Sequence, residues 1–418
     1  MKNLEEVKMK PKKISFLGLF GQQNLGNEST LQAIIYNVRK YFPDAEFKCI
    51  CSGPEDARAR HNIPAFPMRE MPVGVWPGQN NPLVRLIGKV LIRIPLELLL
   101  WGKAFRIMKR VDMLIVPGTG FLTDAYTSSF GWPYDIFKWS LIAKLCRCKL
   151  LYVSIGAGPI YRPLSRWFIK SALSLADFQS YRDNSTMKYL KGIGFRTNDD
   201  RVYPDLAFNL PEAVIPHGDI HKRHRPVVGI GLMSYAGRLS VDKPNNAIYK
   251  AYLEKLLVFV GWLLAHEYDV RLLIGDVLYD RPVVQEFRDL LKEHGLAYNE
   301  GQIIDEPIFS VEHLLSQLAA TDVVVATRFH NVLLALILNK PVISISFHHK
   351  CVSLMSEMGL SEYCQDINHL DVDRLIEQFC ELDKNAENLK PHIKQKTEEY
   401  RRALDEQYTV IFKGIWPE

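Results

Sequence analysis

The sequence predicts an α/β protein made of two doubly wound, Rossmann-like domains that face each other across a cleft. Three observations lead to this fold class. The chain has 418 residues, which suits two domains better than one. Its short runs of Val, Ile and Leu are nearly continuous, as in parallel strands covered on both faces. Each run precedes a stretch with a helical pattern, which predicts βαβ units with right-handed crossovers.

Nine apolar runs are expected to form strands, five in the first half of the chain and four in the second. In doubly wound sheets, ligands bind beyond the carboxyl ends of the strands. We therefore expect the site in the cleft that the two sheets share. The expected strands are Ile14–Phe20, Phe47–Ser52, Met113–Val116, Leu150–Ile155, Phe178–Tyr181, Val227–Leu232, Val270–Ile274, Val323–Ala326 and Val342–Ser346.

The stretch from Pro211 to Pro226 mixes prolines, a glycine and charges without periodicity, as linkers do. It divides the chain into an N-terminal domain over 1–210, a linker over 211–225 and a second domain over 226–390. A polar C-terminal helix is expected over 391–418.

The composition restricts the class of partner. A formal net charge of +5 is too small to indicate nucleic-acid binding and suits a small anionic substrate. Seven cysteines are spread thinly along the chain, which is typical of a reducing compartment. No apolar stretch follows the charged N-terminus, so no secretory signal is indicated. We expect a cytoplasmic protein.

The segment from Leu83 to Arg110 predicts a basic amphipathic helix. Its charges at Arg85, Lys89 and Arg93 recur every four residues and oppose a membrane span. Two interpretations stay open. The helix packs its apolar face on the first domain, or it contacts the inner face of the membrane peripherally.

The first expected strand ends in the glycine-rich sequence GLFGQQNLGNE, before a helix. Free backbone N–H groups at such a turn can bind an anion. The glycine spacing does not match the dinucleotide fingerprint. Asn27 is a candidate helix cap, and Asn24, Asn27 and Glu28 are candidates for hydrogen bonds to sugar hydroxyls.

The strongest candidate site follows the strand that ends at Ala326. Arg328 and His330 lie there at a strand's carboxyl end and at a helix N-terminus, which both favour an anion. The helix dipole should lower the pKa of His330, and a bound phosphate should raise it. Lys350 follows the next strand on the same rim.

Arg182 directly follows another strand, where it can hold a carboxylate through two parallel hydrogen bonds. An ion pair with a neighbouring Asp is the alternative. Asp371 and Asp373 have the spacing of a metal–nucleotide motif, but a helix cap explains them better. The sequence contains no convincing set of metal ligands, so no metal is expected.

Seven motifs occur in order between Ile14 and Leu360: NLGNE, DMLIVPGTGFLTD, SIGAGP, YRDNS, YPDLAF, TRFH and FHHK. With them the chain resembles the polysaccharide pyruvyl transferase family. The resemblance implies a two-domain fold like that of GT-B glycosyltransferases. It also implies transfer of a pyruvyl group from phosphoenolpyruvate to two hydroxyls of a sugar, which forms a cyclic ketal.

The resemblance assigns roles as well. Arg182 and Arg328 would hold the donor, and His330 would be the general acid or base. From their places in the sequence, we expect Lys350 to help neutralise phosphate and Asn24, Asn27, Glu28 and Asp124 to contact the acceptor, a sugar or lipid-linked glycan. Phosphoenolpyruvate would be a co-substrate, and no cofactor is implied. A glycosyltransferase with a nucleotide-sugar donor is the main alternative, and a sugar-binding or scaffold protein is a second.

Overall fold

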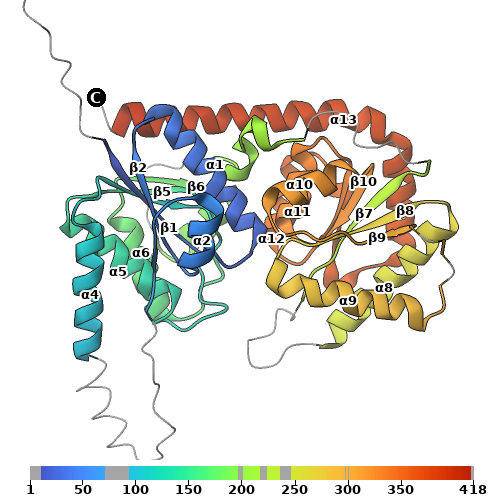
Figure 1. Cartoon of the computed structure of the whole chain (residues 1–418), viewed down its shortest axis with the longest axis horizontal. Coiled ribbons are helices and arrows are strands. Elements are labelled where there is room, and N and C mark those ends of the chain that lie inside the picture. The colour runs from blue at the N-terminus through green and yellow to red at the C-terminus, as the bar shows by residue number, and fades with distance from the viewer. Residues whose placement is uncertain are drawn as a thin grey trace, which may run out of the picture.

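Two parallel six-stranded sheets lie side by side in the computed structural model (Figure 1), which describes residues 11–70, 94–195, 201–216, 224–235, 246–296, 298–299 and 301–415. The first sheet has the order β3-β2-β1-β4-β5-β6 and the second β12-β11-β10-β7-β8-β9. In each sheet the chain starts in the middle, adds two strands on one side and then three on the other. The predicted fold class of two doubly wound domains is confirmed.

All nine expected strands form. The first sheet contains β1 (Lys13–Gly18), β2 (Glu46–Cys51), β3 (Ala65–Pro67), β4 (Met113–Pro117), β5 (Lys149–Ile155) and β6 (Phe178–Tyr181). The second contains β7 (Val227–Gly231), β8 (Asp269–Leu273), β9 (Ile303–Ile304), β10 (Val323–Ala326), β11 (Val342–Ser346) and β12 (Cys364–Asp366). The sequence does not reveal β3, β9 and β12, because runs of two or three residues show no periodicity.

Helices cover both faces of the first sheet because alternate strand residues point to opposite sides. Phe16 and Ile115 pack on the side of α1, whereas Leu17 and Leu114 pack on the side of α4, α5 and α6. The helices of this half are α1 (Leu25–Tyr41), α2 (Pro54–His61), α4 (Ile94–Met108), α5 (Trp132–Leu145), α6 (Pro163–Ser174) and α7 (Asn184–Gly192). Two short 3-10 helices follow, η2 (Leu206–Asn209) and η3 (Glu212–Val214).

The second half has the same arrangement. Its helices are α8 (Asn246–Ala265), α9 (Val277–Glu293), α10 (Val311–Ala319), α11 (Phe329–Ile337) and α12 (His349–Glu357), with short 3-10 helices η4 (Ser361–Tyr363) and η5 (Ile367–His369). The expected linker, 211–225, includes η3, and its residues 217–223 lie outside the described part of the chain.

The C-terminal helix begins earlier than expected. Helix α13 (Val372–Thr409) starts in the second half and runs back across both halves to end on the first in the π-helix η6 (Val410–Ile415) (Figure 1). The predicted start at 391 is therefore wrong: Pro391 lies inside the helix. Near its end, Gln407 is buried and bonds Ser154 and Ser180 at the carboxyl ends of β5 and β6. This helix therefore ties the second half to the first.

Candidate functional site

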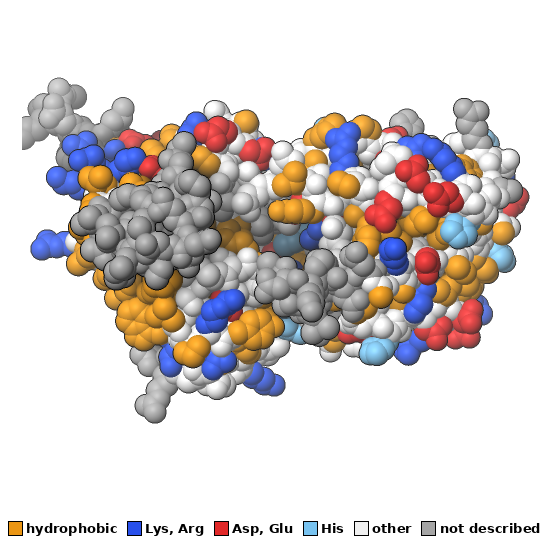
Figure 2. Space-filling model, turned by 90° about the horizontal axis from the view of Figure 1, so that it is seen from below, with side chains coloured by type: hydrophobic (Ala, Val, Ile, Leu, Met, Phe, Trp, Pro, Cys, Tyr) orange, Lys and Arg blue, Asp and Glu red, His pale blue; other side chains and the backbone are white. Residues whose placement is uncertain are grey.

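The two halves meet where the glycine-rich loop after β1 touches the loop after β8. The backbone N–H of Leu25 donates to the carbonyl of Gly275 at 3.0 Å, and that of Val277 donates to the carbonyl of Gln23 at 3.0 Å. The side-chain amide of Asn24 donates to Asp276 at 3.0 Å. These bonds join the carboxyl ends of the two sheets, so side chains on both rims face each other across the junction. Figure 2 shows the hollow between the halves, with histidine and Lys or Arg side chains visible in it.

His330 lies at this junction, in the first turn of α11. A Cβ atom added at Gly26, in the first turn of α1, would lie only 1.9 Å from Nδ1 of His330. The glycine of the NLGNE motif therefore allows the backbone of the first half to approach the imidazole of the second. The candidate histidine is a shared feature of both halves.

The environment of His330 keeps its imidazole neutral. Its pKa is lowered to about 4, chiefly by burial; Asp205 opposes this effect, and nearby Lys350 and Arg182 add to it. Nε2 is buried without a hydrogen-bond partner among the described residues and lies 3.9 Å from Oδ2 of Asp205. The predicted lowering is confirmed, but its main cause is burial rather than the helix dipole. The imidazole is therefore neutral, and its Nε2 is unpartnered among the described residues and can meet a ligand.

Arg182 comes from the opposite rim, directly after β6. Its guanidinium makes only long contacts, with Asp205 at 3.4 Å and Asp183 at 3.6 Å, and its buried Nε has no hydrogen-bond partner among the described atoms. A Cβ at Gly156 would lie 2.4 Å from this guanidinium, which explains the first glycine of the SIGAGP motif. Asp183 also caps α7 by accepting from the N–H of Thr186. The ion-pair interpretation of Arg182 therefore holds in the form of long contacts with acidic neighbours. These contacts leave donors unused, and binding of a carboxylate ligand stays a prediction.

Lys350 completes a group of cations around Phe329. The Nζ of Lys350 and the Cζ of Arg182 each lie 5.1 Å from the centre of the Phe329 ring. Burial lowers the pKa of Lys350 to about 8, and the charge of Arg182 adds to this effect. Both cations lie against the ring and still repel each other, and a bound anion would relieve that repulsion.

Arg328 has a different position from Arg182. Its Nε and one terminal nitrogen donate to the two oxygens of Asp280, at 2.9 and 2.5 Å. Asp280 is fully buried and also accepts from the backbone N–H groups of Ser234, Gly275 and Asp276. Arg328 thus neutralises a buried carboxylate and holds the loop after β8. The side chain stays 21% exposed, so its remaining terminal nitrogen can still meet a ligand.

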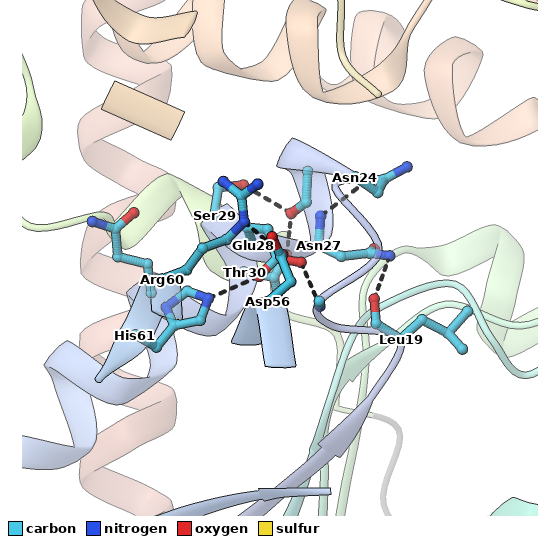
Figure 3. Close-up of polar contacts among 12 residues, drawn as sticks. Leu19, Asn24, Asn27, Glu28, Ser29, Thr30, Asp56, Arg60 and His61 are labelled. Carbon is cyan, nitrogen blue, oxygen red and sulfur yellow. Dashed lines mark hydrogen bonds and ion pairs between the residues drawn. The ribbon is translucent and has the colours of Figure 1, made fainter. Parts of the chain in front are cut away.

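The candidate acceptor residues already have protein partners. Asn24, not Asn27, caps α1: its side-chain oxygen accepts from the backbone N–H of Asn27 at 3.2 Å. The side chain of Asn27 instead donates to the carbonyl of Leu19 at 2.9 Å (Figure 3). The expected cap at Asn27 is therefore wrong, and both side chains hold the glycine-rich loop in place.

Glu28 and Asp124 are buried and hydrogen-bonded through both oxygens. Glu28 accepts from the backbone N–H of Gly21 and points toward His61 of α2, 2.8 Å away (Figure 3). Asp124 accepts from the backbone N–H groups of Tyr161 and Arg162, at 2.7 and 2.9 Å. These contacts brace the loops after β1 and β4, and acceptor binding by these residues stays a prediction.

Two acidic residues of the site, Asp205 and Asp280, are absent from the sequence-based set. Asp205 lies within the YPDLAF motif, where it caps η2 and faces both Arg182 and His330. The motif was the available signal for it. No comparable signal marks Asp280, because its role depends on Arg328, 48 residues further on.

The structure also bears on the expected helix cap at Asp371, on metal ligands and on membrane-spanning helices. Asp371 caps α13 by accepting from the N–H of Arg374, as predicted. Within the described residues, no group of three His, Cys, Asp or Glu side chains is arranged to hold a metal ion. Among the described helices, none is both long and apolar enough to cross a bilayer.

Two Rossmann-like domains with a site at their junction define the GT-B class of folds. UDP-bound MnaA of S. aureus superposes with a TM-score of 0.60, at 13% identity over 97% of each chain. The UDP-GlcNAc 2-epimerase of Neisseria meningitidis has a TM-score of 0.54, at 10% identity over 94% of this chain and 100% of the other. These likenesses concern the fold.

The family is given by the sequence. A sequence model of the polysaccharide pyruvyl transferase family matches residues 24–349, and the chain belongs to that family. The amylovoran biosynthesis protein AmsJ of Erwinia amylovora is 20% identical over 335 residues, 74% of each chain. The predicted family is confirmed, and membership indicates a transferase that acts in polysaccharide biosynthesis.

Proposed function

We propose that this protein transfers the pyruvyl group of phosphoenolpyruvate to two hydroxyls of a glycan, with formation of a cyclic ketal and release of phosphate. One observation carries the proposal beyond family membership. Arg182 of one half and His330, Lys350 and Arg328 of the other gather at the junction around Phe329. A small, highly charged anion is the ligand that such a group can neutralise.

The two anionic groups of the donor fit different cations. Arg182 has unused donors in a planar fork, so it suits the planar carboxylate. Lys350 and the free terminal nitrogen of Arg328 suit the phosphate, which needs charge more than a fixed planar geometry. Fixed cations of this kind stabilise the negative charge that collects on the departing phosphate.

His330 supplies proton transfer in this scheme. It is neutral in the empty site because its pKa is about 4, and the negative charge of the donor raises that pKa on binding. The imidazolium then protonates the methylene carbon, and C2 becomes electrophilic. A sugar hydroxyl attacks C2, and the neutral imidazole accepts its proton.

The remaining steps close the ring. The bond between C2 and the phosphate oxygen breaks, phosphate leaves with the bonding electron pair, and a second hydroxyl attacks C2. Of the two hydroxyl protons, one ends on the new methyl group and the other leaves with phosphate. Asp205, 3.9 Å from Nε2 of His330, stabilises the imidazolium stage.

The competing function is glycosyl transfer from a nucleotide sugar. Calorimetric titration with phosphoenolpyruvate or UDP-GlcNAc separates the two, because donor binding needs no knowledge of the acceptor. We expect phosphoenolpyruvate to bind, Arg182→Ala to weaken that binding, and UDP-GlcNAc to give no heat. Binding of UDP-GlcNAc alone would favour the glycosyltransferase.

Turnover is then measured as phosphate release from phosphoenolpyruvate with candidate glycans. We expect release to depend on a glycan and to persist in EDTA, because fixed cations provide the charge. Glycan binding with no turnover on any donor would favour a binding protein.

A further inference from the structure

The helices α4, α5 and α6 form a layer on the face of the first sheet opposite α1. Many large hydrophobic side chains in this part of the chain are exposed to solvent. Nine of the large hydrophobic side chains that are exposed in the described chain lie between 94 and 167. They are Ile94, Leu98, Leu99, Tyr126, Phe130, Leu145, Tyr161, Leu164 and Trp167. Six of them lie on α4, α5 and α6, and Tyr126, Phe130 and Tyr161 lie in the loops that lead into α5 and α6. Isolated exposed apolar residues are common, but a concentration in and beside one layer indicates a contact surface.

The charge of the same layer is strongly positive. Residues 94–170 contain eleven Lys and Arg but only four Asp and Glu, although the whole chain has a net charge of +5. Two of these acids, Asp124 and Asp135, are buried. In Figure 2, hydrophobic and basic side chains lie beside one another on the part of the first half that grey atoms do not cover.

Helix α4 arranges these residues on one stripe. Ile94, Leu98 and Leu99 are 54%, 68% and 67% exposed, whereas Ala104 and Met108 are buried against the first domain. Arg106 continues the exposed stripe toward the C-terminal end, and the exposed Arg110 follows in the turn after the helix. Neither has an ion-pair partner among the described residues. The outward stripe is therefore apolar at one end and basic at the other.

Helix α6 presents a similar combination beside α5. Trp167 is 54% exposed and packs against Phe137 of α5, with ring centroids 5.2 Å apart and the rings tilted by 49°. Tyr161 and Arg166 are exposed next to it. Exposed Trp and Tyr beside Arg are typical of the interface between lipid headgroups and acyl chains.

We propose that the layer of α4, α5 and α6 binds the surface of an anionic lipid bilayer peripherally. The apolar stripe of α4 and the aromatic rings near α6 enter the headgroup region, and the surrounding Lys and Arg bind lipid phosphates. The charge selects an anionic membrane over a second copy of this chain, because two copies would oppose two positive faces. Of the segment Leu83–Arg110 suggested by the sequence, residues 83–93 lie outside the described chain, and the proposal rests on α4 and α6 alone.

The test is flotation of the full-length protein with vesicles of phosphatidylcholine, with or without phosphatidylglycerol. We expect binding only to the anionic vesicles, and less of it at high salt. Arg106→Gln with Arg110→Gln should weaken binding roughly 25-fold, since each basic residue contributes about fivefold. Leu98→Ser with Leu99→Ser should weaken it about tenfold or more.

Matched controls lie on the second half. Val258→Ser on α8, where Val258 is 59% exposed, and Lys292→Gln on α9 should bind vesicles as the wild type does. All variants should keep their thermal melting and their phosphoenolpyruvate affinity, so this test is independent of the proposed reaction. Equal binding to neutral vesicles, or equal loss in the controls, overturns the proposal. Dissociation of a wild-type dimer by the Leu98 and Leu99 changes would also overturn it, because a second copy would then cover the face.

Discussion

The backbone of Gly26 lies directly against the imidazole of His330, although the two residues belong to different halves of the chain. A methyl group at Gly26 would approach Nδ1 to 1.9 Å, so either the ring or the whole helix α1 must move. The glycine-rich loop thus takes part in the site by leaving space for the histidine rather than by donating side chains.

The first prediction follows from that contact. Gly26→Ala should reduce turnover strongly, because the imidazole is displaced, and should destabilise the fold by about 1–3 kcal/mol through overpacking. Steady-state phosphate release and thermal melting measure the two effects. Gly192→Ala is the control, since a Cβ there meets nothing within 4 Å. Normal turnover in Gly26→Ala would show that His330 does not need this position.

The second prediction separates the two arginines. Arg182→Ala should weaken phosphoenolpyruvate binding with little change in stability, because its protein contacts are long. Arg328→Ala should instead destabilise the fold by about 3–5 kcal/mol, because it leaves the buried carboxylate of Asp280 unpaired. Chemical denaturation and calorimetric titration measure both quantities. Equal stability losses would contradict the distinction.

Arg328→Lys tests the remaining role of Arg328. Lysine keeps one charge near Asp280 but cannot form the bidentate pair, so stability should recover only in part. A variant that folds and binds phosphoenolpyruvate with wild-type affinity would show that Arg328 supports the loop and does not bind the donor.

The third prediction concerns Asp205, which links Arg182 to His330. Asp205→Asn should lower the pKa of His330 further, because the carboxylate is the main group that raises it. The acid limb of the pH–rate profile should therefore shift to lower pH, and donor affinity should change as Arg182 loses a contact. A profile with an unchanged limb would show that Asp205 acts on stability alone.

The fourth prediction is a pH dependence of stability. The pKa of His330 is about 4 in the folded protein and near 6.5 when exposed, so the unfolded chain binds more protons between these values. Above about pH 6.5 the lowered pKa of His330 should not change the free energy of unfolding. As the pH falls to 4, it should reduce that free energy by up to about 3 kcal/mol. If the wild type is the more stable protein at neutral pH, the melting temperatures of wild type and His330→Gln should converge as the pH falls through this range. His313 is an exposed histidine, so His313→Gln is the control and should follow the wild type. Parallel curves for wild type and His330→Gln would contradict the lowered pKa.

The sequence predicts the fold well because buried parallel strands carry continuous apolar runs. It also identifies His330 and Arg182, since a charged residue directly after such a run lies on the carboxyl rim. The start of α13 is less predictable, because the Pro391 inside it suggests a boundary that tertiary packing overrides.

Partner choice within the site could not be predicted for a different reason. Asp280 and Arg328 are far apart in the chain, and so are Asp205 and His330. Asn24 and Asn27 are both good helix caps by residue type, and only the geometry of the loop selects Asn24. The sequence shows which side chains reach the rim but not which of them satisfy one another there.

Proton transfer by His330 is the central claim, and phosphate release by His330→Gln in the presence of an active glycan tests it most directly. Glutamine can hydrogen-bond phosphate but cannot protonate carbon. We predict that the variant binds phosphoenolpyruvate through Arg182 and Lys350 but loses about 10²–10⁴-fold in turnover, nearly as much as His330→Ala. Near-normal turnover in His330→Gln, with donor affinity unchanged, would contradict the mechanism.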